Sequence, residues 1–183
     1  HTRQQSFQSI RTRHSDEIFK NNRIYSITEG EKGNLWLATR NGLHRYANGQ
    51  ITSYYADNYD STSLRSSLVY DVIIDREGTI WAATGKGLSK FLGPGQGFQN
   101  FTRNELACSN CLISNEVLCL QEGKNGTIWI GTVGGLSKYI PEKDTFISYT
   151  EQDGLPNNLI YAIQEDQQGN LWISSNLGIS RMD

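Results

Sequence analysis

Gly33-Asn34-Leu35-Trp36 is the first of four copies of a short frame that recurs along the 183-residue chain. The other copies are Gly78-Thr79-Ile80-Trp81, Gly126-Thr127-Ile128-Trp129 and Gly169-Asn170-Leu171-Trp172. Six residues after each tryptophan comes a second glycine, followed by Leu or Ile, Ser or His, Lys or Arg, and an aromatic residue or Met. Because the frame returns every 43 to 48 residues without a gap, the chain is predicted to be a repeat protein.

Each repeat divides into four short segments that are typical of strands. An apolar run comes before the first glycine, as in Val69-Tyr70-Asp71-Val72, and is too short for a helix. A polar, glycine-bearing turn leads into the tryptophan segment, and the segment after the second glycine forms a third strand. A fourth, half-exposed strand follows, as in Phe146-Ile147-Ser148-Tyr149. Asp75, Glu122 and Asp166 stand before the hairpin glycines and are expected to organise these turns.

Four antiparallel strands in 43 to 48 residues indicate an all-β fold of β-propeller blades. Leucine-rich repeats are shorter, and helical repeats need a 3.6-residue periodicity that the chain lacks. The tryptophans are therefore interpreted as core residues between blades. The expected organisation is one outer strand and linker, three blades and an incomplete fourth blade, at residues 1–20, 21–66, 67–113, 114–157 and 158–183.

The two ends of the chain suggest a fragment of a larger propeller. Phe7-Gln8-Ser9-Ile10 has the pattern of a fourth strand, whereas Ile179-Ser180-Arg181-Met182 is a third strand with none after it. The amino-terminal strand could close a ring within one chain or complete the last blade of a second copy. Since four blades make a tight ring, self-association through the unpaired blade edge is the favoured expectation.

Composition excludes several classes of protein. There are 17 Lys and Arg against 19 Asp and Glu, so the net charge of −2 argues against a generally basic nucleic-acid binder. With 37% hydrophobic and 20% charged residues, the chain is expected to fold. No apolar run approaches the roughly 20 residues of a membrane-spanning helix, so any membrane attachment is expected through parts outside this chain.

The repeat resembles the two-component regulator propeller repeat. The matching stretches are Gly-Asn-Leu-Trp-Leu-Ala-Thr and Gly-Thr-Ile-Trp-Ile-Gly-Thr, each leading into Gly-Leu-x-Lys/Arg-aromatic, together with the linker Asp153-Gly154-Leu155-Pro156-Asn157-Asn158. The resemblance implies a periplasmic sensor region of a hybrid two-component histidine kinase of Bacteroides-type bacteria. It also implies that the signal is an oligosaccharide and that kinase chemistry resides outside this segment.

Loops at the mouth of the propeller channel supply the candidate ligand residues. Amides and basic side chains suit sugar hydroxyls or uronate carboxylates; the alternative for each is an ordinary solvated loop residue. Asp71 occupies a slot on the first strand, where it could face a ligand or bond to a neighbouring blade. The candidates are Asn22, Arg23, Arg40, Arg65, Asp71, Lys86, Asn115 and Asn158.

The sequence contains few residues that could form a catalytic or metal-binding site. Cys108 and Cys111 form a C-x-x-C that could be a disulfide, two free thiols or, less plausibly, a metal or redox site. Cys119 is interpreted as a small buried residue, and His44 as a strand surface residue in a slot that is otherwise serine. No nucleophile, metal or cofactor site can be placed. The segment is therefore expected to be a non-catalytic sensor or scaffold propeller, the alternatives being a general protein-interaction propeller or a propeller-fold lyase or glycosidase.

Overall fold

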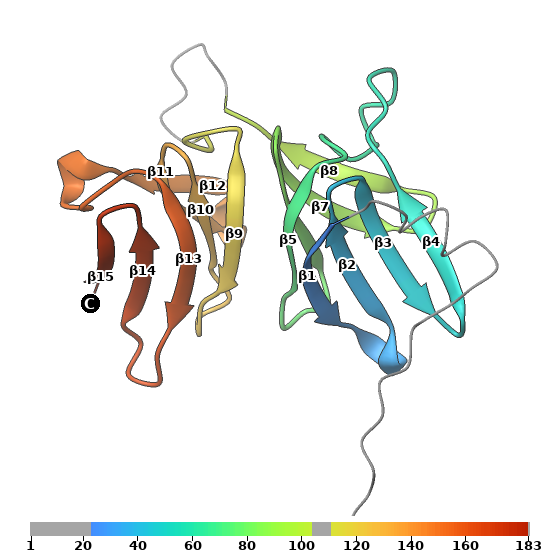
Figure 1. Cartoon of the computed structure of the whole chain (residues 1–183), viewed down its shortest axis with the longest axis horizontal. Helices are drawn as coiled ribbons and strands as arrows, with labels where there is room; N and C mark the ends of the chain where they lie inside the picture. Colours follow the sequence, from blue (N-terminus) through green and yellow to red (C-terminus); the bar gives the residue numbers. More distant parts are fainter. Residues whose placement is uncertain (1–22, 104–110, 183) are drawn as a thin grey trace, which may run out of the picture.

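The computed structural model describes residues 23–103 and 111–182, and these form four antiparallel sheets (Figure 1). The first three sheets have four strands each and the fourth has three, always in the order of the chain. The first sheet holds β1 (Ile24–Glu29), β2 (Leu35–Thr39), β3 (Gly42–Ala47) and β4 (Gln50–Tyr54); the second holds β5 (Val69–Ile74), β6 (Ile80–Thr84), β7 (Gly87–Gly93) and β8 (Gly97–Phe101). The third holds β9 (Val117–Glu122), β10 (Ile128–Thr132), β11 (Gly135–Ile140) and β12 (Thr145–Tyr149); the fourth holds β13 (Ile160–Glu165), β14 (Leu171–Ser175) and β15 (Gly178–Met182).

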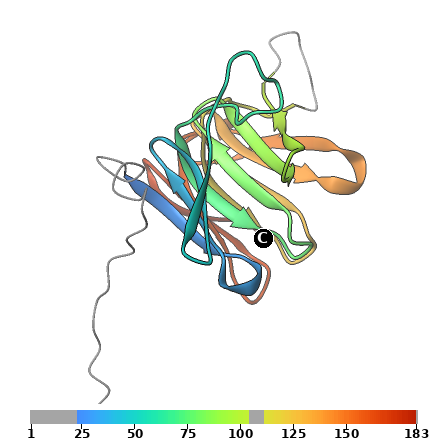
Figure 2. The ribbon, with the colours of Figure 1, turned by 90° about the vertical axis from the view of Figure 1, so that its right-hand side faces the viewer.

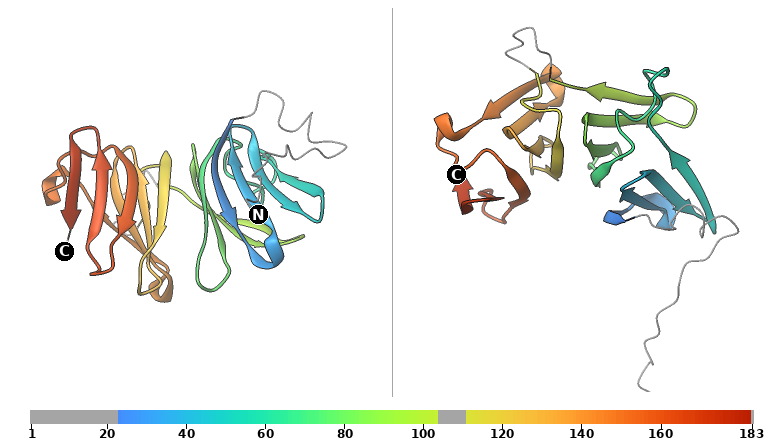
Figure 3. Two further views of the ribbon diagram at one scale, coloured as in Figure 1. Left: turned by 60° about the horizontal axis from the view of Figure 1, so that its bottom comes forward. Right: turned by 45° about the horizontal axis from the view of Figure 1, so that its top comes forward.

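The four sheets are blades set around an open arc (Figure 3). Packing between blades runs in series, because β1 packs on β5, β5 on β9 and β9 on β13. The first strand of every blade is therefore the innermost strand. This confirms the all-β propeller fold and the prediction that the chain is a fragment of a larger propeller. The predicted strand at residues 7–10 lies outside the described residues.

Hairpin turns between the first and second strands of the blades gather at one end of the arc, the lower end in Figures 1 and 2. Two of them are organised by an aspartate, as predicted. Asp75 Oδ1 accepts the N–H groups of Glu77 and Thr79 at 3.0 and 2.8 Å, and Asp75 Oδ2 accepts from Trp81 Nε1 at 2.8 Å. Asp166 accepts from its own turn and from Trp172 Nε1 in the same way. The aspartate thus fixes both the turn and the orientation of the indole.

The prediction that Glu122 organises its own turn is wrong. Its carboxylate reaches to the preceding blade, where Oε1 lies 2.6 Å from Arg76 Nε and Oε2 accepts the Arg76 N–H. Glu122 stands one residue earlier in its repeat than Asp75 and Asp166 do in theirs, and Gly123 holds the aspartate position. Its carboxylate therefore bonds the turn of the preceding blade, as the Glu165 carboxylate does by accepting the Lys124 N–H at 2.9 Å. Three short 3-10 turns complete the described structure, at Glu31–Gly33, Pro141–Lys143 and Glu151–Asp153.

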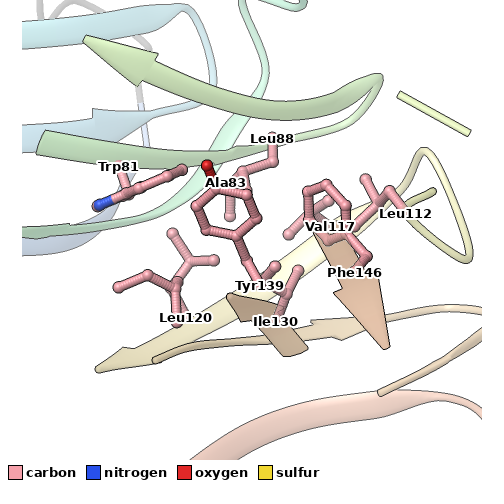
Figure 4. Close-up of a cluster of buried hydrophobic side chains, with 10 residues drawn as sticks. Trp81, Ala83, Leu88, Leu112, Val117, Leu120, Ile130, Tyr139 and Phe146 are labelled. Atoms are coloured by element: carbon pink, nitrogen blue, oxygen red, sulfur yellow. The ribbon is translucent and has the colours of Figure 1, made fainter. Parts of the chain in front are cut away.

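The core lies between the blades, as the tryptophan spacing predicts. Trp81 is 1% exposed and packs at the interface of the second and third blades, beside Leu120 and Tyr139 (Figure 4). Trp36 and Trp129 are similarly buried, whereas Trp172 is 38% exposed. Trp172 belongs to the last blade of the arc, so the exposed face of its indole is the face that a further blade would cover.

The interpretation of His44 as a strand surface residue is wrong. His44 is fully buried, and its Nδ1 lies 2.9 Å from Ser53 Oγ on the neighbouring fourth strand. Burial lowers the pKa of the imidazole, which favours its neutral form. Ser89 and Ser137 hold the same position in the next two blades and are also buried. The side chain at this position is polar because it bonds the third strand to the fourth. Its polarity therefore does not indicate exposure to solvent.

Candidate functional site

The end of the arc opposite the hairpins is the mouth of the channel, and it carries nearly all of the predicted ligand residues. Connections from one blade to the next arrive there, and so do the turns between the second and third strands (Figure 1). Each of the latter turns is closed by a threonine or serine. In the third blade, Thr132 Oγ1 donates to Gly135 O at 2.8 Å and accepts the Gly134 N–H at 3.0 Å. This closure holds the two turn residues outward, towards solvent.

Four basic residues lie on this rim with exposed side chains. They are Arg23 just before β1, Arg40 and Lys86 in the turns between second and third strands, and Arg65 in the connection to the second blade. Asn22 lies outside the described residues. The structure thus brings Arg23, Arg40, Arg65 and Lys86 to one end of the arc.

Asn115 and Asn158 serve the connections between blades. Asn115 Oδ1 accepts the Arg103 N–H at 2.7 Å, and Asn158 Oδ1 accepts the Glu151 N–H at 2.9 Å. Ser67 occupies the same position before the second blade, and its hydroxyl accepts the Ala56 N–H at 3.0 Å. Each of these side chains ties the start of a connection to its end. Their recurring role is therefore structural, whatever else they contact.

Asp71 bonds to the neighbouring blade, which is one of the two alternatives that the sequence leaves open. Its Oδ2 accepts the Leu120 N–H at 2.9 Å, and its Oδ1 accepts the Val72 N–H, also at 2.9 Å. A hydroxyl makes a comparable bridge between the first two blades, where Thr28 Oγ1 donates to Val72 O at 2.6 Å. Oδ2 of Asp71 thus holds the inner strands of the second and third blades together, while Oδ1 bonds within its own strand.

A row of tyrosines on the inner strands is the feature that sequence reasoning missed. Tyr25, Tyr70 and Tyr161 occupy the second position of β1, β5 and β13, and Leu118 holds that position in β9. Each of the four strands has its register shift at this position. Tyr25 and Tyr161 are 44% and 52% exposed, although a tyrosine within an apolar run is usually read as core. The recurrence of Tyr in one slot of three repeats was the available signal.

Polar partners accompany this tyrosine row. The rings of Tyr25 and Tyr70 lie 5.9 Å apart, and the Tyr70 hydroxyl donates to Glu116 Oε1 at 3.2 Å. Partial burial, and then the Glu116 carboxylate, raise the pKa of Tyr70, so the phenol stays protonated. The Tyr161 hydroxyl donates to Asn176 Oδ1 at 2.9 Å. The arrangement offers aromatic faces flanked by oriented hydrogen-bonding groups, which suits recognition of a polar ligand.

The cysteines and acidic residues do not assemble a reactive centre. Burial raises the pKa of the free Cys119 thiol to about 12, which makes it a poor nucleophile. Cys111 is disulfide-bonded, and because Cys108 lies outside the described residues its pairing with Cys111 stays a prediction. Within residues 23–103 and 111–182, no three His, Cys, Asp or Glu side chains are grouped so as to hold a metal ion. No helix in this described part is long and apolar enough to cross a membrane.

Comparisons with known proteins agree with the repeat and the fold. Residues 18–41, 111–134 and 154–177 match the two component regulator propeller family, in the first, third and fourth blades. No curated protein matches the chain significantly. The extracellular domain of a putative hybrid two component system from B. thetaiotaomicron superposes with a TM-score of 0.81 at 25% identity, over 89% of this chain and 23% of that one. The chain thus spans less than a quarter of that domain.

More distant structures share the fold alone. A catalytically inactive virginiamycin B lyase from Staphylococcus aureus superposes with a TM-score of 0.66 at 19% identity, over 88% of this chain and 53% of the lyase. PorZ, a surface component of the type-IX secretion system of Porphyromonas gingivalis, superposes at 0.55 with 14% identity, over 86% of this chain and 31% of PorZ. The matched segments, the blade geometry and the hybrid-system neighbour point the same way: three segments of this propeller match the two component regulator propeller family.

Proposed function

We propose that the chain is a non-catalytic propeller segment of the periplasmic sensor region of a hybrid two component histidine kinase and response regulator. We further propose that the mouth of its arc recognises an oligosaccharide. The tyrosine row carries this proposal, because Tyr25 and Tyr161 are 44% and 52% exposed on the innermost strands and Tyr70 is only partly buried. Flat aromatic faces beside a few oriented polar groups are the usual lining of a small-molecule site.

The charge of the rim narrows the ligand class. Arg23, Arg40, Arg65 and Lys86 are exposed around the mouth, whereas Glu116 is half-buried and accepts a hydrogen bond from Tyr70. Guanidinium groups bind carboxylates in a bidentate geometry. An acidic oligosaccharide that carries uronate groups therefore suits this surface better than a neutral one.

Isothermal titration calorimetry against neutral and uronate-bearing glycan fragments tests the proposal. We expect binding to an acidic fragment, weakened at least about tenfold by Tyr70→Ala, which corresponds to about 1.4 kcal/mol of binding free energy. Tyr59→Ala is the matched control, because Tyr59 is fully exposed on the connection between β4 and β5, away from the tyrosine row. Absence of binding across the panel, or equal losses from both variants, would contradict the ligand role.

A scaffold role is the second candidate function, and the interblade bonds of Asp71, Asn115 and Asn158 favour it. In that case the segment spaces other parts of the sensor and binds no glycan. Substitution of Tyr70 would then change neither ligand binding nor signalling in a full-length receptor, whereas loss of a blade would abolish signalling. A reporter assay in cells that carry the full-length protein separates the two roles.

A further inference from the structure

We propose that a cavity between the outer strands of the first and second blades binds an alkylammonium or guanidinium group, as carried by organic amines and by the side chains of Lys and Arg. This outer cavity has a volume of about 340 Å³, within the range of small-ligand sites. Its walls come from β4, from the connection at residues 55–68 and from the hairpin between β7 and β8. The proposal goes beyond glycan recognition, because the tyrosine row lies on the inner strands and the outer cavity on the outer ones.

The aromatic floor of the outer cavity belongs to blade packing. The rings of Tyr54, Phe91 and Phe98 lie 5.2, 5.7 and 5.2 Å from one another. The same cluster recurs at the interface of the second and third blades, with ring centroids 5.3, 5.5 and 5.0 Å apart, among Phe101, Tyr139 and Phe146. The floor is therefore a structural feature of both interfaces, and the features that distinguish the outer cavity lie in its other walls.

A glycine-rich hairpin keeps one wall of the cavity open. Gly93, Gly95 and Gly97 line it, in the turn between β7 and β8. A Cβ at Gly95 would meet nothing within 4 Å, and a Cβ at Gly93 would meet only the amide nitrogen of Gln96, at 3.8 Å. The hairpin thus contributes backbone, and no side chain, to the space in front of the aromatic floor.

The corresponding hairpin of the third blade carries larger side chains. It runs through the 3-10 turn Pro141–Lys143 to Asp144, whose carboxylate accepts the Tyr139 hydroxyl at 2.8 Å. In the second blade Phe91 stands in place of Tyr139 and has no hydroxyl to donate. The open wall is therefore particular to the interface of the first and second blades.

Tyr55 adds an aromatic ring that blade packing does not require. Thr102 and Thr150 hold the corresponding position after β8 and β12. Tyr55 lines the outer cavity and is 45% exposed, and its ring packs edge-on against His44 with centroids 5.9 Å apart. Since a threonine suffices in the other blades, the exposed part of this ring is available to a ligand.

Asp60 supplies a negative charge at the cavity. Its Oδ1 accepts the Thr62 N–H at 2.8 Å and the Thr62 hydroxyl at 2.6 Å, whereas its Oδ2 accepts no hydrogen bond from the residues that the structure describes. The hydrogen bonds from Thr62 lower the pKa of Asp60, so the carboxylate is ionised at neutral pH. Among the described residues no Lys or Arg lines the cavity, and Arg45, whose charge acts on Tyr54, is not part of its walls.

The connection that carries Asp60 is held firmly on the second blade. Thr62 O accepts the Phe98 N–H at 2.7 Å, and Asn100 Nδ2 donates to Ser63 O at 2.9 Å. The carboxylate is therefore positioned before any ligand arrives, which lowers the cost of binding.

An ionised carboxylate beside aromatic rings selects an organic cation. A cation is attracted to the face of an aromatic ring, and the N–H groups of an ammonium or guanidinium ion can donate to the open Oδ2 of Asp60. A neutral ligand of the same shape gains neither interaction, and an acidic ligand is repelled by the carboxylate. The walls of the outer cavity thus favour positive charge, in contrast to the basic rim at the mouth.

Titration of the whole chain with butylammonium, followed by the NMR signals of its backbone amides, tests the proposal. The neutral probe 1-butanol has a similar shape and lacks the charge. Acetyl-lysine methylamide presents the same ammonium group as a protein side chain does, so its affinity relative to butylammonium distinguishes a protein partner from a free amine.

Two variants remove the two attractions separately. Asp60→Asn keeps the Oδ1 acceptor for Thr62 and removes the charge, and Tyr55→Thr introduces the residue that the other blades carry. Asp57→Asn and Tyr59→Thr are the matched controls, because both residues lie exposed on the same connection and neither lines the cavity.

We expect butylammonium to shift the amide signals of Gly93, Gly95 and Gly97 and to bind at least about fivefold more tightly than 1-butanol. Asp60→Asn and Tyr55→Thr should each remove most of this preference, whereas both controls should retain it. The same spectra show whether each variant is folded, and Tyr55→Thr gives an independent reading should Asp60→Asn loosen the connection. Absence of binding, equal affinities for the charged and neutral probes, or equal losses in the variants and their controls would overturn the proposal.

Discussion

Replacing Trp81 with alanine should destabilise the propeller far more than the same change at Trp172. Both indoles stand in the same frame and donate Nε1 to an aspartate of their own turn, at 2.8 and 2.9 Å. Loss of that hydrogen bond should therefore lower the unfolding free energy by about the same amount in both variants. The remaining difference is burial, since Trp81 is 1% exposed and Trp172 is 38% exposed. The comparison isolates what a neighbouring blade adds to the same residue.

The magnitude follows from the packing. Trp81 lies between two blades, with the rings of Tyr139 and Phe101 at 5.3 and 6.0 Å and Lys90 Nζ 5.2 Å from the indole. Its removal leaves a closed interblade cavity, so Trp81→Ala should cost about 3–5 kcal/mol. Trp172 has no blade on its exposed face, and its loss opens a surface depression that water can fill. Trp172→Ala should therefore cost about 1–2 kcal/mol, because both the buried area and the cavity are smaller.

Urea denaturation followed by circular dichroism measures both values without relying on tryptophan fluorescence. Measurements at a concentration where light scattering shows a single chain keep any second copy from covering Trp172. If Trp81 packs in the core between blades, the loss of unfolding free energy should be at least about 1 kcal/mol larger for Trp81→Ala than for Trp172→Ala. A loss below 1 kcal/mol for Trp81→Ala, or equal losses for the two, would refute the assignment of Trp81 to the interblade core.

Three further changes test other parts of the structure. Gly135→Ala should cost about 1–3 kcal/mol more than a surface substitution and more than Gly178→Ala in the monomer, since φ at Gly135 is 138° and its Cβ would lie 2.4 Å from a carbonyl oxygen; urea titration of both variants measures this. Cys119 should resist alkylation in the native state, because burial raises the pKa of its thiol from 9.0 to about 12. The stability that the neutral thiol contributes to the folded state is therefore lost as pH rises from about 9 through 12. Cys119→Ala should flatten that part of the plot of unfolding free energy against pH. Arg76→Ala, which breaks the half-exposed pair with Glu122, should cost no more than about 1 kcal/mol, and titration in 1 M salt should shrink the difference.

Much of the fold could be predicted from the sequence because two residue types mark the blade so clearly. Glycine is needed where the third strand begins in a left-handed conformation against a carbonyl oxygen, as at Gly87 and Gly135. Tryptophan is needed where one blade packs on the next, as at Trp81. These demands are met in the first three blades and the same residues recur in the fourth, so their spacing reveals the period. The same logic predicted the aspartate-closed turns at Asp75 and Asp166.

Less of the candidate site could be predicted, because its properties arise between repeats. His44 is buried beside Ser53 on the neighbouring strand, and the sequence pattern does not show that these two side chains form a pair. Glu122 bonds across to the preceding blade, and so its role depends on where two turns meet. Tyr70 resembles a core residue in its own strand, yet the register shift of β5 and the position of Glu116 on the next blade place its hydroxyl in a polar setting. Sequence patterns describe a blade well and describe contacts between blades poorly.

The inner strands make recognition and blade packing parts of one network. Tyr70 contacts the ring of Tyr25 on one side and Glu116 on the other, so it links three successive blades. One residue further along β5, Asp71 fixes the inner strand of the third blade through the Leu120 N–H. A ligand that binds the tyrosine row therefore acts on the same residues that set the spacing of the blades. Since interactions in repeat proteins run between neighbours, a change at this mouth would pass from blade to blade along the arc instead of staying at one loop.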